Sequence, residues 1–137
     1  MAQRTAQPGP CPCASGQPYG ACCGRYHRGE ASPPTAEALL RARFSAFALG
    51  DAPFLRRTWH RSTRPTTLEL DRGQHWTRLE ILGRTGDALF DAEGTVDFRA
   101  HYRVNSLDGV QSENSAFVRD GGEWRYRGRA PRGPVAR

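Results

Sequence analysis

The chain has 137 residues, of which 37% are hydrophobic and 25% charged, so it can form one domain with its own core. This composition excludes a fully disordered chain. No run approaches the roughly 20 apolar residues that a membrane span needs, and the first ten residues lack the apolar centre of a secretory signal. We therefore expect a cytoplasmic protein that does not contact membranes.

The positive charge lies mainly at the two ends of the chain. The net charge is +6, and all 20 basic residues are arginines. Residues 1–29 contain three arginines and no acid, residues 30–118 contain eleven arginines against twelve acids, and residues 119–137 contain six arginines against two acids. Basic ends are suited to anionic partners, although they can also serve only as solubilising charge.

All four cysteines fall in one stretch, CPCASGQPYGACC. Clustered cysteines in a reducing compartment are more often metal ligands than disulfides. Zinc accepts four thiolates in a tetrahedral site, and the Gly- and Pro-containing loop between the two cysteine pairs suits the turn that this requires. We expect one zinc ion per chain on Cys11, Cys13, Cys22 and Cys23. A redox or disulfide centre and a different metal are the alternatives.

A zinc ion with four cysteine ligands has no free coordination position, so the site is predicted to be structural rather than catalytic. His27 lies four residues after Cys23 and is an alternative fourth ligand. Because Cys23 is already available, we expect His27 either to support the site from outside the ligand set or to be exposed.

Two helices are predicted after the cysteine stretch. Leucine and phenylalanine recur at helical spacing in residues 36–49, with Thr35 as the N-cap and Gly50 as the terminating residue. Asp51 can cap a second helix, which we place at residues 52–60. The two helices therefore meet at a tight Gly-Asp junction.

The hydrophobic period then changes to that of strands. The strongest alternation is in TVDFRAHYRV, and the sequence Asp120-Gly121-Gly122 predicts a hairpin turn between the last two strands. The predicted strands are residues 66–70, 76–84, 95–104, 112–119 and 123–129.

This order of elements predicts an α+β fold, with two N-terminal helices packed on a curved antiparallel sheet of about four to five strands. A small zinc knuckle precedes this unit. We divide the chain into a knuckle with a flexible lead at residues 1–29, an α+β domain at residues 35–129 and a flexible basic tail at residues 130–137.

A cavity between the helices and the sheet is the natural place for a second site. His60 can act as an acid or base near neutral pH, or it can interact with the end of the second helix. Glu113 faces either the cavity or water, and His101 is expected in solvent. No spacing identifies a Ser-His-Asp set. The candidate pocket residues are Trp59, His60, Ser62, Arg64 and Glu113, with His75 as a further polar candidate.

The cysteine stretch resembles the SEC-C motif, a zinc-binding knuckle found at the C-terminal end of the SecA preprotein translocase and in many other bacterial proteins. The usual form is C-x-C-G-S-G-x-x-Y-x-x-C followed by His or Cys. The chain departs from it at Ala14, where the motif has Gly, and at Gln17, where a basic residue is common. It matches at Cys11, Cys13, Ser15, Gly16, Tyr19, Cys22 and Cys23.

A wider resemblance extends over nearly the whole chain. With the cysteine stretch before them, the segments AEALLRARFSAFALGD, TWHRSTRP, GTVDF and FVRDGGEWRY resemble the YchJ-like family of bacterial proteins. Arg61 stands where that family more often has Pro. The resemblance implies a nuclear transport factor 2-like cone, which isomerases, dehydratases and many non-enzymatic proteins share, so the fold alone does not determine the function.

The closed zinc site and the basic ends favour a non-enzymatic binding or adaptor module that contacts a protein, ribosome or nucleic-acid partner. The resemblance implies the same, because the SEC-C motif of the translocase contacts a chaperone and ribosomes. Residues 125–137 are candidates for phosphate contacts, with Trp124 or Tyr126 to stack on bases. The alternative is a small-molecule or enzymatic pocket, isomerase- or dehydratase-like, around His60. The sequence leaves the oligomeric state open.

Overall fold

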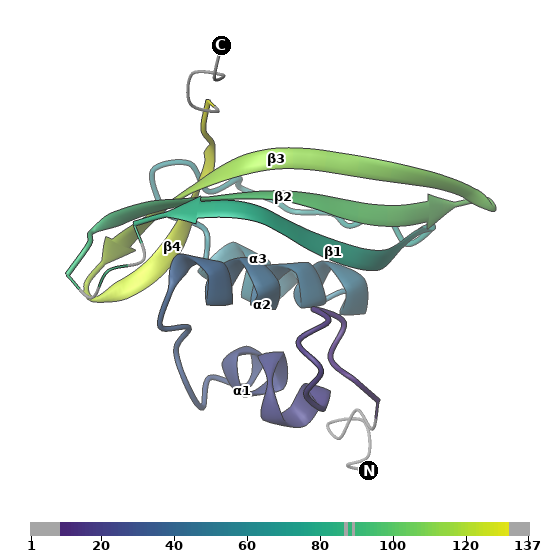
Figure 1. The fold of residues 1–137 in the computed structure, drawn as a ribbon, viewed down its shortest axis with the longest axis horizontal. Helices are drawn as coiled ribbons and strands as arrows, with labels where there is room; N and C mark the ends of the chain where they lie inside the picture. Colours follow the sequence, from purple (N-terminus) through teal and green to yellow (C-terminus); the bar gives the residue numbers. More distant parts are fainter. Residues whose placement is uncertain (1–8, 87, 89, 132–137) are drawn as a thin grey trace.

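Four antiparallel strands form one curved sheet, and helices cover one of its faces (Figure 1). The computed structural model describes residues 9–86, 88 and 90–131. The strands follow one another in the order β1-β2-β3-β4, so each pairs with its neighbour in sequence. The predicted α+β class is confirmed. The bounds are β1 (Gln74–Thr85), β2 (Glu93–Val104), β3 (Leu107–Asp120) and β4 (Glu123–Arg129).

Strand β2 has the period-two burial that its sequence predicts. Val96, Phe98 and Ala100 are buried against the helices, whereas Arg99 between them is exposed. Phe98 is paired with Glu113 on β3, and paired residues of an antiparallel sheet point to the same face. Glu113 therefore points inward.

Both hairpin turns of β3 use backbone conformations with positive φ. Gly121 and Gly122 have φ of 66° and 87° between the paired residues Asp120 and Glu123, as the Asp-Gly-Gly sequence predicts. Asn105 and Ser106, with φ of 51° and 69°, make the turn between β2 and β3 without glycine. This turn was not predicted, and as a result β3 begins five residues earlier than expected.

The predicted strand at residues 66–70 is wrong. In the described part of the chain this segment pairs with no strand, and β1 forms that edge of the sheet. Its two leucines, Leu68 and Leu70, pack against the core from an irregular backbone. A short alternating run can bury its apolar side chains in this way without joining a ladder.

The two predicted helices are present as α2 (Ala36–Leu49) and α3 (Ala52–Arg57). Thr35 caps α2, and Gly50 ends it in the left-handed conformation with φ of 79°. Helix α3 is three residues shorter than predicted. After it, Trp59 forms an isolated parallel bridge with Tyr126 of β4, in which the Thr58 carbonyl accepts a hydrogen bond from the Tyr126 amide at 2.8 Å.

The N-terminal segment contains a short 3-10 turn, η2 (Tyr19–Ala21), and a helix that was not predicted, α1 (Cys23–His27). It lies on the side of α2 that faces away from the sheet (Figure 1). Helix α2 is consequently buried on opposite sides. Its Phe44 packs against Trp76 of the sheet, and its Ser45 contacts the cysteine stretch.

The predicted flexible lead and most of the predicted basic tail fall on residues 1–8 and 132–137, which lie outside the described residues. The division of the chain into three parts remains a prediction. No helix in the described ranges has the length and apolar character needed to cross a membrane.

The N-cap of α2 gives a direct stability test. The Thr35 side-chain oxygen accepts a hydrogen bond from the Ala38 amide at 3.0 Å. We expect Thr35→Ala to lower the free energy of unfolding by about 1 kcal/mol, measured by urea denaturation. Thr67→Ala is the matched control, since Thr67 is exposed and its side chain makes no hydrogen bond among the described residues. Equal losses at the two positions would contradict the capping role.

Candidate metal centre

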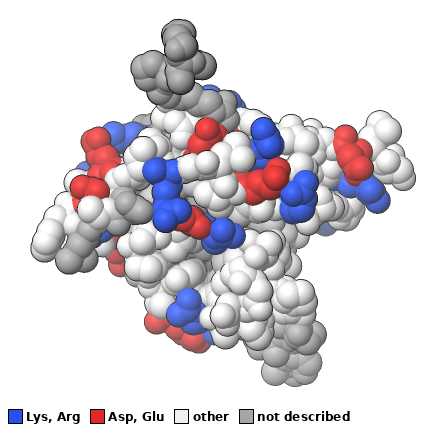
Figure 2. All heavy atoms as spheres, viewed as in Figure 1, with Lys and Arg blue, Asp and Glu red and all other residues white. Residues whose placement is uncertain are grey.

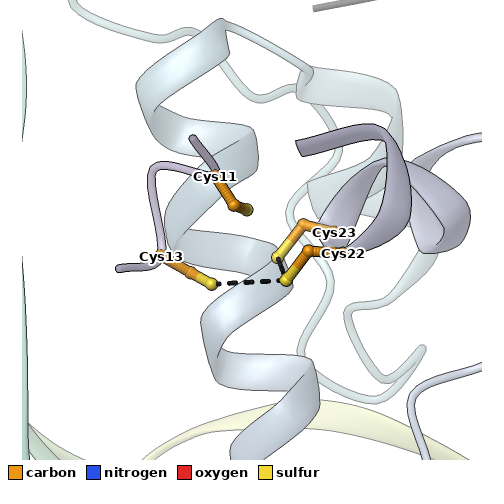
Figure 3. A group of neighbouring side chains, drawn as sticks. All are labelled: Cys11, Cys13, Cys22 and Cys23. Carbon is orange, nitrogen blue, oxygen red and sulfur yellow. Dashed lines mark hydrogen bonds between the residues drawn. The ribbon is translucent and has the colours of Figure 1, made fainter. Parts of the chain in front are cut away.

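The fold brings the four cysteines together from two short pieces of chain (Figure 3). Cys11 and Cys13 lie in a loop that is closed by a hydrogen bond from the Cys11 amide to the Gln17 carbonyl at 2.9 Å. Cys22 follows η2, and Cys23 is the first residue of α1. All four side chains point into the space between these pieces (Figure 3).

The sulfur positions fit a tetrahedral metal ion. The four Sγ atoms all lie within 4.8 Å of one another, and none of them is in a disulfide. The Cys13 and Cys22 sulfurs are 3.7 Å apart, and those of Cys22 and Cys23 are 4.0 Å apart. Zinc–sulfur bonds of about 2.3 Å in a tetrahedron place the sulfurs about 3.8 Å apart. The donor set and its spacing therefore suit zinc.

The thiols influence one another's protonation. Hydrogen bonds from Cys13 and Cys23 lower the pKa of Cys11. The same contacts raise the pKa of Cys13 to about 11 and also raise that of Cys23, since each donates its proton to the Cys11 sulfur. Several thiolates this close together need a cation between them, and a metal ion that binds here must displace the remaining protons.

Helix α2 supports the cysteine cluster through two contacts. The buried Ser45 hydroxyl lies 3.4 Å from the Cys11 sulfur, and Arg41 Nη1 donates to the Cys13 carbonyl at 2.8 Å. Within the loop, the Ser15 hydroxyl lies 3.1 Å from the Cys22 sulfur. The two contacts from α2 were not predicted, because they join residues about 30 positions apart in the sequence.

His27 is not part of the ligand group, and its side chain is only 4% exposed. Its Nε2 lies 2.9 Å from the Ala42 carbonyl, which can only accept, so Nε2 carries the proton and donates it. Nδ1 then accepts from the Tyr19 hydroxyl at 2.6 Å. Of the two alternatives expected for His27, exposure is wrong, and a buried place outside the ligand group is found. His27 instead joins α1 to α2 next to the cysteine cluster.

The candidate pocket residues do not lie together. Trp59 and Glu113 line a cavity between α2 and the sheet, but His60, Ser62 and Arg64 are not among its lining residues. His60 Nδ1 is 2.7 Å from the Ser62 hydroxyl, and its Nε2 is 3.5 Å from an Asp120 carboxylate oxygen. Arg64 donates from Nε and Nη2 to the Trp59 carbonyl.

Other polar candidates face away from the cavity. His75 is exposed on β1, and His101 Nε2 lies 2.8 Å from a Glu80 carboxylate oxygen on the outer face of the sheet. The two aromatic side chains suggested for base stacking are packed against the core. Trp124 is 2% exposed and donates to the Pro34 carbonyl, and Tyr126 donates its hydroxyl proton to Glu113.

The two helices on a curved four-stranded sheet, with a four-cysteine cluster before them, define a nuclear transport factor 2-like protein with a SEC-C motif. A family model described as the YchJ middle NTF2-like domain matches residues 35–128. The chain is 52% identical to a UPF0225 protein of Streptomyces coelicolor, over 85% of this chain and 91% of that protein. A UPF0225 protein of Corynebacterium glutamicum is 50% identical, over 85% and 92% of the two chains. The chain therefore belongs to the YchJ (UPF0225) family.

Two solved structures have the same fold. One is the solution structure of RPA3114, a SEC-C motif containing protein from Rhodopseudomonas palustris, with a TM-score of 0.75 and 28% identity, covering 85% of this chain and 94% of that one. The other is the crystal structure of a SEC-C motif containing protein from Psychrobacter arcticus, with a TM-score of 0.66 and 23% identity, covering 99% and 85% of the two chains.

The buried His27 predicts a pH-dependent stability. Burial lowers its pKa below the ordinary value of 6.5. As the pH falls through 6.5, the unfolded chain takes up this proton before the folded chain does, so the free energy of unfolding decreases until the pH reaches the lowered pKa. One such group contributes a slope of at most about 1.4 kcal/mol per pH unit. Urea denaturation between about pH 7.5 and about pH 5 measures it.

The variant His27→Gln retains a donor and an acceptor but does not titrate. The stability advantage of the wild type over this variant should therefore shrink as the pH falls. His101→Gln, which removes an imidazole from a surface pair with Glu80, is the control and should not show that shrinkage. A wild-type advantage that stays constant over the whole pH range would contradict the role of His27.

Proposed function

We propose that this protein is a non-enzymatic binding module, in which a structural zinc knuckle and an adjacent basic surface contact a protein, ribosome or nucleic-acid partner. The observation that carries the proposal is the group of four cysteine sulfurs within 4.8 Å of one another. Four thiolates saturate a zinc ion, so the ion has no position at which to activate water or substrate. Its role is then to hold the surface around it in one conformation.

A row of arginines, which we call the basic ridge, lies next to the knuckle and consists of Arg25, Arg56, Arg57 and Arg64. Arg57 connects the two parts, because its Nη2 donates to the Tyr26 and His27 carbonyls of α1. Arg56, Arg57 and Arg64 line one shallow depression beside α3. Arg57 therefore joins the arginines of the depression to α1, the helix that carries Arg25.

The basic ridge is held in place without being neutralised. Arg25 donates to the Cys22 carbonyl, Arg56 to the Pro65 carbonyl and Arg64 to the Trp59 carbonyl. Among the described residues, none of the four ridge arginines forms an ion pair with a carboxylate. Carbonyls fix a guanidinium but leave its full charge for a partner.

On the outer face of the sheet, in contrast to the basic ridge, arginines are paired with carboxylates. There Arg78 and Arg99 both lie within ion-pair distance of Glu80, and Arg103 pairs with Asp108. On the side of the molecule drawn in Figure 2, arginines and acids are interspersed and neither sign forms a large patch. A zinc ion with four thiolates carries a net charge of about −2, so the ridge rather than the knuckle supplies the positive charge.

The metal content of the protein tests whether the four cysteines form a structural zinc knuckle. We expect the purified full-length chain to contain about one zinc per chain and to release protons when zinc is added to the metal-free protein, because the pKa values of Cys13 and Cys23 are raised. Replacement of all four cysteines by serine should abolish both the bound zinc and the release of protons. Ser112→Ala, an exposed position on β3, is the control. The site would be refuted if the four-serine variant and Ser112→Ala both contained the same amount of zinc, well below one ion per chain.

Salt-dependent co-sedimentation with purified bacterial ribosomes tests whether the basic ridge contacts a partner. We expect binding at about 50 mM salt that falls steeply towards about 300 mM. Arg25→Gln combined with Arg56→Gln should weaken it strongly. The control, Arg78→Gln combined with Arg99→Gln, removes the same charge from the outer face of the sheet. No sedimentation at low salt would exclude the ribosome, and equal losses in the two double variants would exclude the ridge as the contact surface.

A further inference from the structure

A cavity of about 200 Å³ lies between α2 and the inner face of the sheet. An apolar cavity of about 150 Å³ is enough to bind benzene, so this one has room for a six-membered ring with a short substituent. The exposed residue Gln111 is among its lining residues, which places an opening there. The apolar wall includes Leu40, Phe44, Phe47, Trp76, Phe98 and Ala100.

One end of the cavity contains a buried guanidinium with unused donors. Arg43 of α2 is 4% exposed, and its carbon Cζ lies 5.0 Å from the Trp59 ring centroid and 4.4 Å from that of Tyr126. Both hydrogen bonds that Arg43 makes within the described residues come from Nη1, to the Leu55 carbonyl and the Thr58 hydroxyl. Burial lowers its pKa to about 10, so it stays charged at neutral pH. Nε and Nη2 remain available.

A second donor in the cavity wall also lacks an acceptor. The indole Nε1 of Trp59 is buried and has no hydrogen-bond partner among the described residues. A buried donor left in this state costs about 1–3 kcal/mol. Trp59 packs against Tyr126 with ring centroids 5.0 Å apart, and Arg43 lies over both rings. The two residues with unused donors, Arg43 and Trp59, thus belong to one aromatic cluster.

The acceptor in the same wall is already occupied. Glu113 Oε2 accepts hydrogen bonds from the Ser115 hydroxyl at 2.5 Å and from the Tyr126 hydroxyl at 2.8 Å. Its Oε1 lies 3.6 Å from Arg129 Nη2. The carboxylate charge is therefore balanced by groups of the protein itself, and Tyr126 has no proton left to donate. The polar end of the cavity is short of acceptors and has donors to spare.

We propose that this cavity binds a small apolar molecule, about one six-membered ring in size, whose carbonyl oxygen accepts hydrogen bonds from Arg43 beside Trp59. The ring lies against the apolar wall, where burial of its surface drives binding. A carbonyl oxygen matches the unused donors, and a hydrocarbon leaves them unpaired. Both a neutral ketone and a carboxylate present this oxygen. The site is separate from the cysteine cluster and from the basic ridge.

Three ligands of similar ring size separate these chemistries: acetophenone carries a neutral carbonyl, benzoate carries a carboxylate and ethylbenzene has no oxygen. The measurement is the shift of the Trp59 and Trp76 indole N–H signals in ¹H–¹⁵N spectra of the full chain during titration. We expect acetophenone or benzoate to shift the Trp59 signal and to bind at least about tenfold more tightly than ethylbenzene.

Two variants assign the effect to the cavity. Arg43→Met keeps most of the side-chain volume but removes the donors, so it should abolish the preference for the oxygen-bearing ligand while ethylbenzene still binds. Because this variant also loses two structural hydrogen bonds, a second one is needed. Ala100→Leu fills the cavity from β2 and should abolish binding of all three ligands. Ala92→Leu, at an exposed position, is its control and should bind as the wild type does.

The outcomes are distinct. Tighter binding of acetophenone alone identifies a neutral carbonyl ligand, and tighter binding of benzoate alone identifies a carboxylate. If no ligand shifts either indole signal at millimolar concentration, or if ethylbenzene binds as tightly as the other two, the proposal is wrong. The proposal is also wrong if the Ala100→Leu variant binds the ligands as the wild type does while its spectrum shows that it is folded.

Discussion

Helix α2 is covered on two opposite sides, and the rest of the structure depends on this constraint. Towards the sheet, Phe44 packs against Trp76 with ring centroids 6.1 Å apart. On the other side, the Ala42 carbonyl accepts a hydrogen bond from His27 Nε2 at 2.9 Å, and the fully buried Ser45 contacts Cys11. Without the N-terminal segment this side of α2 would face water. The cysteine knuckle is therefore part of the core rather than an attachment to it.

The same helix brings the cysteine cluster and the cavity close together. Ala42 contacts the knuckle through His27, and the next residue, Arg43, points its guanidinium to the opposite side, over Trp59 and Tyr126. Successive residues of a helix point in different directions, so α2 presents one set of side chains to each site. A displacement of α2 by the knuckle would move Arg43 with it, because a helix moves as a rigid element.

The sequence predicts those features that depend on neighbouring residues. The bounds of α2 follow from Thr35 and Gly50, and the four sulfurs come together because they lie within thirteen residues of one another. The hydrogen bond from His27 to Ala42 was not predicted, because it depends on α2, which packs against His27 only in the folded chain. Arg43 falls at helical spacing from Leu39 and Leu40, on the apolar side of α2, but arginine is almost never buried unless it is paired. No local pattern in the sequence therefore marks Arg43 as a buried residue.

Under the proposed function, a structural metal ion would control partner binding without contacting the partner. When metal binding and folding are coupled, the free energy of binding becomes free energy of folding. Here the knuckle fixes α1, and the Tyr26 and His27 carbonyls of α1 in turn hold Arg57 of the basic ridge. A zinc ion on the four cysteines would thus order the ridge through main-chain hydrogen bonds. Its effect on a partner would depend on the conformation of α1 and not on any charge that the ion itself presents.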